Sequence, residues 1–245
     1  MNTTTPTSPI ALVTGADRGL GLALAANLLE KGWRVFAGQY MPDWTELTAL
    51  KAGYADQLTA LPLDVTDIDS VRSAAARVGQ DVDHVDLVIN NAGVISPTIV
   101  HPIQEAQDYD EMHRMYDINA VGPLRVIDAF LPLVAAGGLK RLAFVSSEAA
   151  SINRCKRDAW YGYCMSKTAL NMAISVLFNR LRSESYTFRV YHPGWMRSYM
   201  GGTKNNTADL EPEEAAVPAI TYFLRDRADE DRLVMRDWQG HEWPW

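Results

Sequence analysis

Short apolar runs alternate along the chain with longer segments in which apolar residues recur every three or four positions. A short apolar run predicts a strand buried on both faces, whereas the longer period predicts a helix with one apolar face. The predicted strands are Ile10–Thr14, Arg34–Gly38, Gln57–Leu63, Asp86–Asn90, Lys140–Ser146, Tyr186–His192 and a short last one, Leu233–Met235. The predicted helices are Leu20–Lys31, Asp67–Val78, Ile103–Tyr116, Ala120–Ala136, Trp160–Ser183 and Glu213–Leu224.

Strands that alternate with helices predict βαβ units and a mostly parallel sheet of about seven strands, covered by helices on both faces. We therefore expect a doubly wound, three-layer α/β/α architecture. Because no internal repeat or long linker divides the chain, we expect one domain over residues 10–245, preceded by a flexible, threonine-rich stretch over residues 1–9. The charge run Arg225–Arg232 is expected to be a solvated turn.

Composition narrows the class of protein. The 245 residues are 47% hydrophobic and 22% charged, with a formal net charge of −7, which gives no reason to expect nucleic acid or an anionic membrane as a partner. No apolar stretch approaches the ~20 residues that span a bilayer. Cys155 and Cys164 lack metal-ligand spacing, and the first nine residues lack the pattern of a signal peptide. We expect a cytoplasmic protein without a metal centre.

A glycine-rich turn joins the first strand to the first helix. It reads Thr14-Gly15-Ala16-Asp17-Arg18-Gly19-Leu20-Gly21. Residues without a Cβ let backbone N–H groups approach a pyrophosphate at the positive end of a helix, and the first βα turn is where Rossmann-like sheets bind dinucleotides. A sharp turn with no ligand would also use glycine. The position of the turn favours a dinucleotide site.

The spacing T-G-x-x-x-G-x-G resembles the glycine motif of the short-chain dehydrogenase/reductase family. That resemblance implies that Gly15, Asp17, Arg18, Gly19, Leu20 and Gly21 bind the cofactor. Asn90-Asn91-Ala92-Gly93 is similar to the family's N-N-A-G motif, which passes the adenosine ribose, although Asn91 could instead tie neighbouring strands together. Asp64-Val65 resembles the aspartate that accepts a hydrogen bond from the adenine, although an aspartate that simply approaches a helix would look the same.

The same resemblance supplies the catalytic residues. Tyr163 and Lys167 match Y-x-x-x-K, whereas Tyr161 has Met165 four positions on and serves as an internal control. Positions i and i+4 share a helix face, so Lys167 can lie beside the phenol. A nearby ammonium and an oxidised nicotinamide are expected to lower the pKa of Tyr163 from ~10.

Two further residues complete the implied set. The backbone carbonyl of Asn119 would position a water beside the lysine. Ser147 would bind the substrate oxygen. The spacing from Ser147 to Tyr163 is longer than in many family members, which leaves Ser146 and Ser151 as alternatives.

After the sixth strand, Pro193, Gly194, Met196 and Ser198 match the family's P-G-x-V-x-T, which holds the nicotinamide carboxamide. The choice of dinucleotide depends on other residues. An NAD-selective site usually has an acidic residue at the end of the second strand, but this chain has Gln39-Tyr40 there. Arg18 can reach a 2′-phosphate, although no Arg or Lys follows the second strand. We therefore expect NADP(H), with NAD(H) as the alternative.

The expected function is hydride transfer between NADP(H) and a carbonyl or alcohol substrate. Finer features, among them the long serine–tyrosine spacing, resemble the C-factor and sniffer-type carbonyl reductase branch. The resemblance also implies a homodimer or homotetramer. The main alternative is a regulatory protein that binds a dinucleotide on the same fold with little turnover. A mostly apolar substrate site is expected at Val94, Ile95, Ile152, Trp195 and Tyr199, together with Ser147.

Overall fold

A computed structural model describes residues 8–226 and 231–245, and it contains one eight-stranded sheet in the order β3-β2-β1-β4-β5-β6-β7-β8. All neighbouring strands are parallel except β7 and β8, which are antiparallel. The strands are β1 (Ile10–Val13), β2 (Arg34–Gln39), β3 (Leu58–Pro62), β4 (Leu87–Asn90), β5 (Arg141–Val145), β6 (Thr187–His192), β7 (Met235–Asp237) and β8 (Glu242–Trp243). Most of the predicted flexible N-terminal stretch and part of the charge run Arg225–Arg232 lie outside the described residues.

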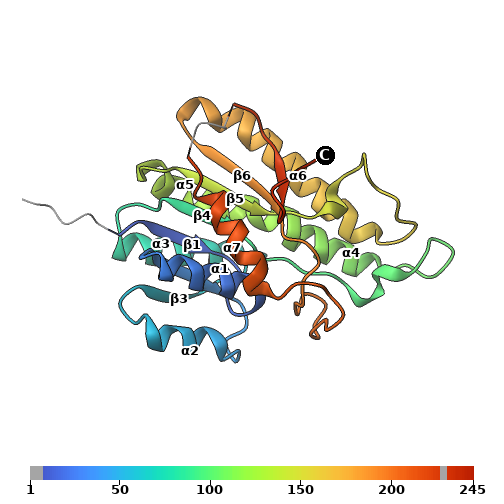
Figure 1. Ribbon diagram of the computed structural model, residues 1–245, viewed down its shortest axis with the longest axis horizontal. Coiled ribbons are helices and arrows are strands. Elements are labelled where there is room, and N and C mark those ends of the chain that lie inside the picture. The colour runs from blue at the N-terminus through green and yellow to red at the C-terminus, as the bar shows by residue number, and fades with distance from the viewer. Residues whose placement is uncertain (1–7, 227–230) are drawn as a thin grey trace, which may run out of the picture.

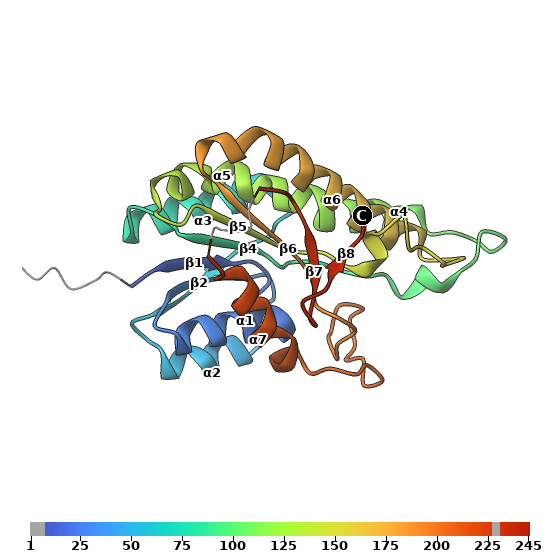
Figure 2. The same cartoon turned by 45° about the horizontal axis from the view of Figure 1, so that its top comes forward.

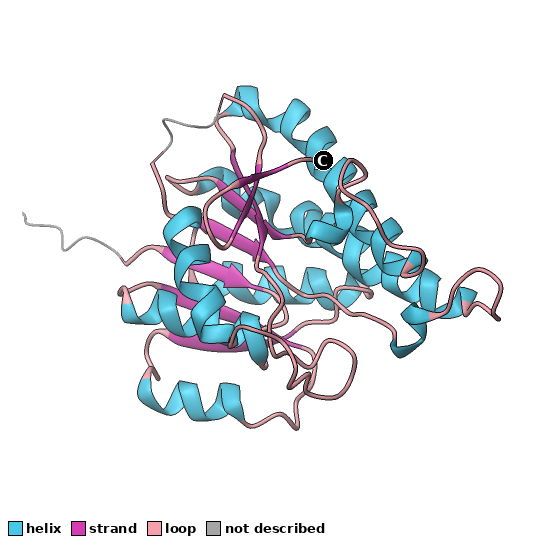
Figure 3. Cartoon of the chain, turned by 45° about the vertical axis from the view of Figure 1, so that its right-hand side comes forward, coloured by secondary structure: helices cyan, strands magenta, loops and turns pink. Residues whose placement is uncertain are grey.

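Helices cover both faces of the sheet (Figures 1 and 2). One face packs on α1, α2 and α7, and the other on α3, α5 and α6, each with its own buried apolar cluster. The helices are α1 (Gly19–Glu30), α2 (Glu46–Gly53), α3 (Ile68–Asp81), α4 (Tyr109–Tyr116), α5 (Gly122–Ala136), α6 (Tyr161–Leu181) and α7 (Pro212–Phe223). The expected doubly wound fold is therefore confirmed, with eight strands instead of about seven. Figure 3 shows the helices grouped around the strands.

Two predicted elements need correction, and two elements of the structure were not predicted. The last predicted strand, Leu233–Met235, begins at Met235 instead, and the hairpin strand β8 was not predicted. Helix α2 also escaped prediction because its sequence buries a single side chain, Leu47. The predicted helix Ile103–Tyr116 begins only at Tyr109, because the Asp108 carboxylate accepts the N–H of Glu111 and caps the helix there.

A five-residue π turn, η2 (Asp117–Val121), joins α4 to α5, so the helix runs without a break over Tyr109–Ala136. These 28 residues are long and apolar enough to cross a membrane by length and composition, contrary to the expectation that no stretch would be. A helix in a protein core passes the same test. Here Val126, Phe130 and Val134 are fully buried in the cluster beneath the sheet, which is the packing of a core helix.

The strand order places a switch point between β1 and β4, because the chain leaves β1 for β2 and β3 and returns to β4 on the other side. Val13 pairs with Ala37 on one side and Ile89 on the other. The residues that follow these strands therefore meet at one edge of the sheet. Ligands of open α/β sheets bind in the crevice at such a point.

Two buried arginines, Arg141 in β5 and Arg189 in β6, fasten the C-terminal end of α7 to the sheet. Arg141 is fully buried; its Nη1 donates to the carbonyl oxygens of Phe223 at 2.5 Å and Arg225 at 3.0 Å. Arg189 donates through Nε to the carbonyl oxygen of Tyr222 at 3.2 Å. The Tyr222 and Phe223 carbonyls are the last two of α7, and the Arg225 carbonyl follows two residues after its end. The two guanidinium groups therefore lie at the negative end of the helix and donate to its terminal carbonyls.

We predict that Arg141→Met lowers the free energy of unfolding by about 3 kcal/mol, because it removes a buried donor to the Phe223 carbonyl and one donor to the Arg225 carbonyl, which Arg189 also meets. The measurement is urea unfolding followed by circular dichroism. Arg180→Met is the control: Arg180 is 70% exposed and paired with Glu184 at the surface, so its loss is expected to change the free energy by less than about 0.5 kcal/mol. An Arg141→Met protein as stable as the parent would contradict this account.

Candidate active site

The turn between β1 and α1 needs its glycines for steric reasons. Gly15 and Gly19 have φ angles of +61° and +55°, which favour glycine. A Cβ on Gly21 would lie 2.0 Å from the carbonyl oxygen of Gly15, so no other residue fits there. Arg18 is the N-cap residue of α1, but its side chain accepts no hydrogen bond from the helix, and the first turn of α1 carries no acidic residue. The first N–H groups of α1 are therefore available to an anion.

Thr14 and Asn91 tie this turn to the end of β4. The Thr14 hydroxyl accepts the N–H groups of Asn91 and Ala92, both at 3.0 Å. The Asn91 amide donates to the carbonyl oxygens of Thr14 at 3.0 Å and Gly15 at 3.1 Å. A Cβ on Gly15 would lie 2.9 Å from the Cα of Ala92. The alternative interpretation of Asn91, as a residue that joins neighbouring strands, therefore describes what it does in this structure.

Asp64 also has a local structural use. Its Oδ1 accepts the N–H of Thr66 at 2.8 Å and the Thr66 hydroxyl at 2.7 Å, which shapes the turn into α3. Val65 is buried against Gly122 at the start of α5. Asp64 therefore makes the contacts expected of an aspartate that leads into a helix, and it lies at the same edge of the sheet as the glycine turn.

Tyr163 and Lys167 lie one turn apart on α6, and both are buried. The indole of Trp160 meets the edge of the phenol ring, with the centroids 6.1 Å apart. The Lys167 Nζ donates to the carbonyl oxygen of Val145, at the end of β5, at 3.1 Å. A Cβ on Gly93 would lie 3.5 Å from that Nζ. The pair therefore faces the ends of β4 and β5.

Burial dominates the ionisation of both groups. It raises the pKa of Tyr163 to about 12, against a smaller lowering by the Ser147 hydroxyl, and it lowers the pKa of Lys167 to about 8. In this structure the Lys167 ammonium does not lower the pKa of Tyr163; the expectation from the sequence concerned the ammonium together with an oxidised nicotinamide, and it stays a prediction. The physical reason is that the desolvation of the phenolate outweighs the charges nearby, and the ammonium is directed to a backbone carbonyl instead.

The structure separates the three candidate serines. Ser147 is the one whose hydroxyl lowers the pKa of the Tyr163 phenol, against the larger effect of burial. Ser146 donates to the Asn171 side chain at 2.7 Å in the core, and Ser151 donates to the carbonyl oxygen of Trp245 at 3.3 Å. The longer loop is accommodated because a short 3-10 turn, η3 (Glu148–Ala150), begins directly after Ser147.

Asn119 lies in the middle of the π turn η2 and is fully buried. Its side chain accepts the N–H of Val94 at 2.8 Å and donates to the carbonyl oxygen of Val94 at 2.9 Å and to the Ser166 hydroxyl at 3.0 Å. A π turn lengthens the hydrogen-bonding step, which leaves a helix carbonyl without its usual partner. The asparagine is thus wedged between the β4 loop and α6, within the turn that frees such a carbonyl.

Arg18 and the loop after β2 form one group. Arg18 Nη1 bonds to buried Asp17 Oδ2 at 2.7 Å, and the guanidinium carbon lies 4.5 Å from the ring centre of Trp44. Gln39 donates to the carbonyl oxygen of Met41, and Tyr40 is 61% exposed. Trp44 was not predicted from the sequence. The sequence did offer one signal for it, namely an aromatic residue shortly after the second strand in a chain whose glycine turn carries an arginine.

The segment after β6 bends sharply. Gly194 has a φ of +82°, and a Cβ there would lie 2.9 Å from the side chains of Leu210 and Trp238. Met196 bridges to Leu210, and the Ser198 carbonyl oxygen accepts the N–H of Asn205 at 3.0 Å. We call residues 195–210 the cover segment. Pro193, Gly194, Met196 and Ser198 thus lie in sequence along the edge where β6 ends.

An apolar cluster surrounds the phenol. It contains Tyr163, Met115 and Ala149, with Val94, Ile95, Ile99, Trp160, Cys164 and Met200 packed against them. Of the predicted substrate residues, Val94 and Ile95 belong to it. Ile152 and Trp195 do not, and they are 73% and 54% exposed. Trp160 and Cys164 were missed, although both lie within three residues of Tyr163.

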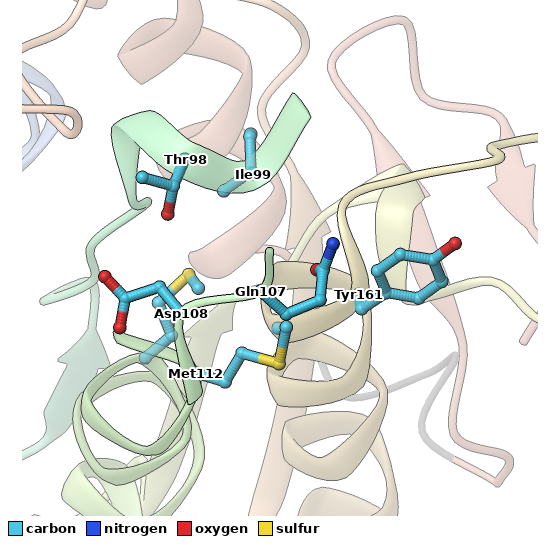
Figure 4. A pocket seen from close by; sticks show the side chains of 8 residues that line it. Thr98, Ile99, Gln107, Asp108, Met112 and Tyr161 are labelled. Carbon is cyan, nitrogen blue, oxygen red and sulfur yellow. The ribbon is translucent and has the colours of Figure 1, made fainter. Parts of the chain in front are cut away.

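A cavity of about 10 Å³ adjoins this cluster, between the loop before α4 and the start of α6 (Figure 4). This volume suits about one water molecule. Its lining is Thr98, Ile99, Gln107, Asp108, Met112, Met115, Tyr161 and Gly162. Among residues 8–226 and 231–245, no group of three or more His, Cys, Asp or Glu side chains could hold a metal ion.

Comparison with known proteins identifies the family. A family model for short chain dehydrogenases matches residues 9–209. The chain is 38% identical over 161 residues to the C-signal of Myxococcus xanthus, which covers 66% of this chain and 93% of that protein.

Two solved structures have nearly the whole fold. A short-chain dehydrogenase/reductase from Burkholderia multivorans with bound NADP is 28% identical, with a TM-score of 0.85 over 97% of this chain and 100% of that one. The NADPH-bound carbonyl reductase from chicken fatty liver is 28% identical, with a TM-score of 0.83 over 97% of this chain and 99% of that one. The expected relation to the C-factor and carbonyl reductase branch is confirmed. The chain belongs to the short-chain dehydrogenase family and is an oxidoreductase that depends on NADP or NAD.

Proposed function

We propose that the protein reduces a carbonyl compound, or oxidises the corresponding alcohol, with Tyr163 as the general acid or base. The observation that carries the proposal is the buried pair Tyr163–Lys167, which faces the ends of β4 and β5 with the Ser147 hydroxyl on the phenol. A buried, perturbed pair of ionisable groups beside a ligand crevice is typical of a catalytic site.

The residues fit a dinucleotide. The cradle at Gly15 and Gly21 would be filled by a Cβ, and the first N–H groups of α1 have no side-chain cap, as a pyrophosphate requires. Residues along the same edge would hold the rest of the dinucleotide: Gln39, Tyr40, Asp64, Val65 and Asn91–Gly93 on the adenosine side, and Lys167, Pro193, Gly194, Met196 and Ser198 on the nicotinamide side. The bound cofactor supplies the hydride, so the protein must supply the proton.

The raised pKa of Tyr163 suits a proton donor. At neutral pH a phenol with a pKa of about 12 stays protonated, and it can give its proton to an oxygen that gains negative charge. The Ser147 hydroxyl would orient the same oxygen. Lys167, with its pKa lowered to about 8, keeps its charge at neutral pH and would stabilise the phenolate left behind once it turns from the Val145 carbonyl. A water held by a freed carbonyl of the π turn at Asn119 would then return the proton.

The substrate is proposed to be a mostly apolar carbonyl or alcohol compound, because apolar side chains surround the phenol. We further propose that residues 10–245 act as one domain in a cytoplasmic homodimer or homotetramer. The similarity to a protein named C-signal favours a second candidate, a dinucleotide-binding signalling protein with little turnover. Binding of NADPH without oxidation over a panel of aldehydes, ketones and quinones would favour that candidate.

Tyr163→Phe is predicted to reduce kcat for carbonyl reduction by about 10²-fold or more, because the proton donor is lost. NADPH affinity, measured by calorimetry, should change little. Tyr161→Phe is the matched control. The Tyr161 hydroxyl donates to the backbone carbonyl of Asp158 at the helix start, so turnover should persist. Substantial turnover by Tyr163→Phe would reject Tyr163 as the donor.

Lys167→Met is predicted to abolish turnover and yet stabilise the protein at pH 7 by about 2 kcal/mol, because the buried ammonium is removed. The lysine pKa is about 8 in the folded protein, below its ordinary value of 10.5. Between pH 8 and pH 10.5 the unfolded chain holds the lysine proton more often than the folded protein does, so the free energy of unfolding of the parent rises with pH over this range. Urea unfolding from pH 7 to pH 10 should show this rise in the parent and not in the variant.

Lys156→Met, which alters an exposed lysine, serves as the control and should keep the pH dependence of the parent. A Lys167→Met protein that is less stable than the parent at pH 7 would show that burial of the charge is not the dominant effect.

Arg18→Leu is predicted to lower kcat/KM for NADPH by about tenfold to a hundredfold, the effect of losing one charge-assisted contact to a phosphate. The value for NADH should stay within about threefold, because NADH has no 2′-phosphate. Steady-state kinetics with both cofactors measure this. A parent enzyme that prefers NADH would overturn the choice of NADP.

A further inference from the structure

We propose that Trp44 and Tyr199 form a latch that couples the 2′-phosphate end of the cofactor to the cover segment over the substrate site. The ligand that closes the latch is an adenine nucleotide with a phosphate on its 2′-oxygen. This inference rests on the proposed use of NADP(H), and it assigns roles to two residues outside the glycine turn and the Tyr163–Lys167 pair.

Three side chains from separate parts of the chain, Arg18, Trp44 and Tyr199, contact one another in a row. The Arg18 guanidinium carbon lies 4.5 Å from the ring centre of Trp44, in the β2–α2 loop. The Trp44 and Tyr199 rings meet edge to face, with centroids 4.9 Å apart and an interplanar angle of 71°. Both contacts are attractive, since a cation favours the face of an indole and aromatic rings favour the edge-to-face arrangement.

The cover segment is also attached beside Tyr199. The N–H of Ile95 donates to the carbonyl oxygen of Met200 at 3.2 Å, and Met200 packs in the cluster around Tyr163. Tyr199 is therefore held from the cofactor side, while its neighbour Met200 is held from the substrate side. A shift of Trp44 would therefore displace Tyr199 and, through it, Met200 beside the proposed substrate site.

Trp44 carries a second sign of a ligand. Its Nε1 is buried and has no hydrogen-bond partner in the described part of the chain. A buried N–H donor without a partner is costly, unless an acceptor arrives. Arg18 spends one of its five N–H donors on Asp17, so others can meet the same acceptor. A phosphate monoester has enough oxygens to accept from both groups.

The proposed sequence of events follows from these contacts. A 2′-phosphate that bridges Arg18 and the Trp44 Nε1 fixes the indole, and the indole then fixes Tyr199 and the cover segment. Without the phosphate, the stack keeps only its own weak contacts. Trp44 and Tyr199 are thus positioning residues, which act on substrate binding through the cover segment.

The test is limited trypsin digestion of the full chain, followed by mass spectrometry. Lys204 lies in the cover segment, and its side chain is 40% exposed, so cleavage after it reports on opening of this segment. The probes are 2′,5′-ADP and 5′-AMP, which differ by the 2′-phosphate and have no nicotinamide. We expect 2′,5′-ADP to slow cleavage after Lys204 by about tenfold, the effect of one added strong contact, and 5′-AMP to leave it unchanged.

Three variants separate the latch from simple packing. Trp44→Ala should lose the protection, while Trp44→Phe, which keeps a ring but removes the N–H donor, should keep only part of it. Tyr199→Ala should still bind 2′,5′-ADP in calorimetry and yet show no protection. In turnover with NADPH, Tyr199→Ala should raise KM for the carbonyl substrate by about tenfold, with kcat within about threefold.

The outcomes are distinct. If 2′,5′-ADP binds to the parent protein without protecting Lys204, the latch is overturned and the proposed function stands. If 2′,5′-ADP does not bind and NADH supports turnover, both the choice of NADP and the latch fall. Equal protection by 2′,5′-ADP and 5′-AMP would also overturn the latch, because the 2′-phosphate would then play no part.

Discussion

The junction of β1 with β4 is the constraint on which the rest of the structure depends. The sheet order reverses there, and the Thr14 hydroxyl and the Asn91 amide fasten the two strand ends to each other. The glycine turn can then fold so tightly that no Cβ fits between Gly21 and the Gly15 carbonyl, and α1 begins with N–H groups that no side chain caps. A side chain at Gly21, or the loss of either tie, would fill or open the crevice for a dinucleotide.

The proposed catalytic pair, Tyr163 and Lys167, lies at the same edge of the sheet. Burial makes ionisation of Tyr163 and of Lys167 unfavourable, so both groups depend on what is placed beside them. In this structure, Lys167 satisfies a backbone carbonyl and the phenol stays neutral. A positive charge brought next to the phenol would favour the phenolate. The ionisation of Tyr163 and Lys167 therefore depends on the charges of the ligands that enter the site.

The sequence predicted the fold and indicated a candidate site, because both rest on local patterns. Apolar runs placed six strands to within one residue, and the glycine spacing reflects contacts that a Cβ forbids. The misses have physical reasons. Helix α2 buries too little to leave a periodic pattern, and β8 is a two-residue hairpin strand. The Trp44–Tyr199 contact joins residues far apart in the chain, which no local pattern reports. The high pKa of Tyr163 depends on burial, which only the packed structure shows.

The central claim is that the Tyr163 phenol exchanges the proton with the substrate. The most direct measurement replaces Tyr163 with 3-fluorotyrosine, which lowers the intrinsic pKa of the phenol and nearly keeps its size. Alcohol oxidation needs the phenolate, so its rate should rise with pH through the pKa of this group. The account predicts that the rise moves to lower pH in the fluorinated protein. A pH profile that does not move would contradict it.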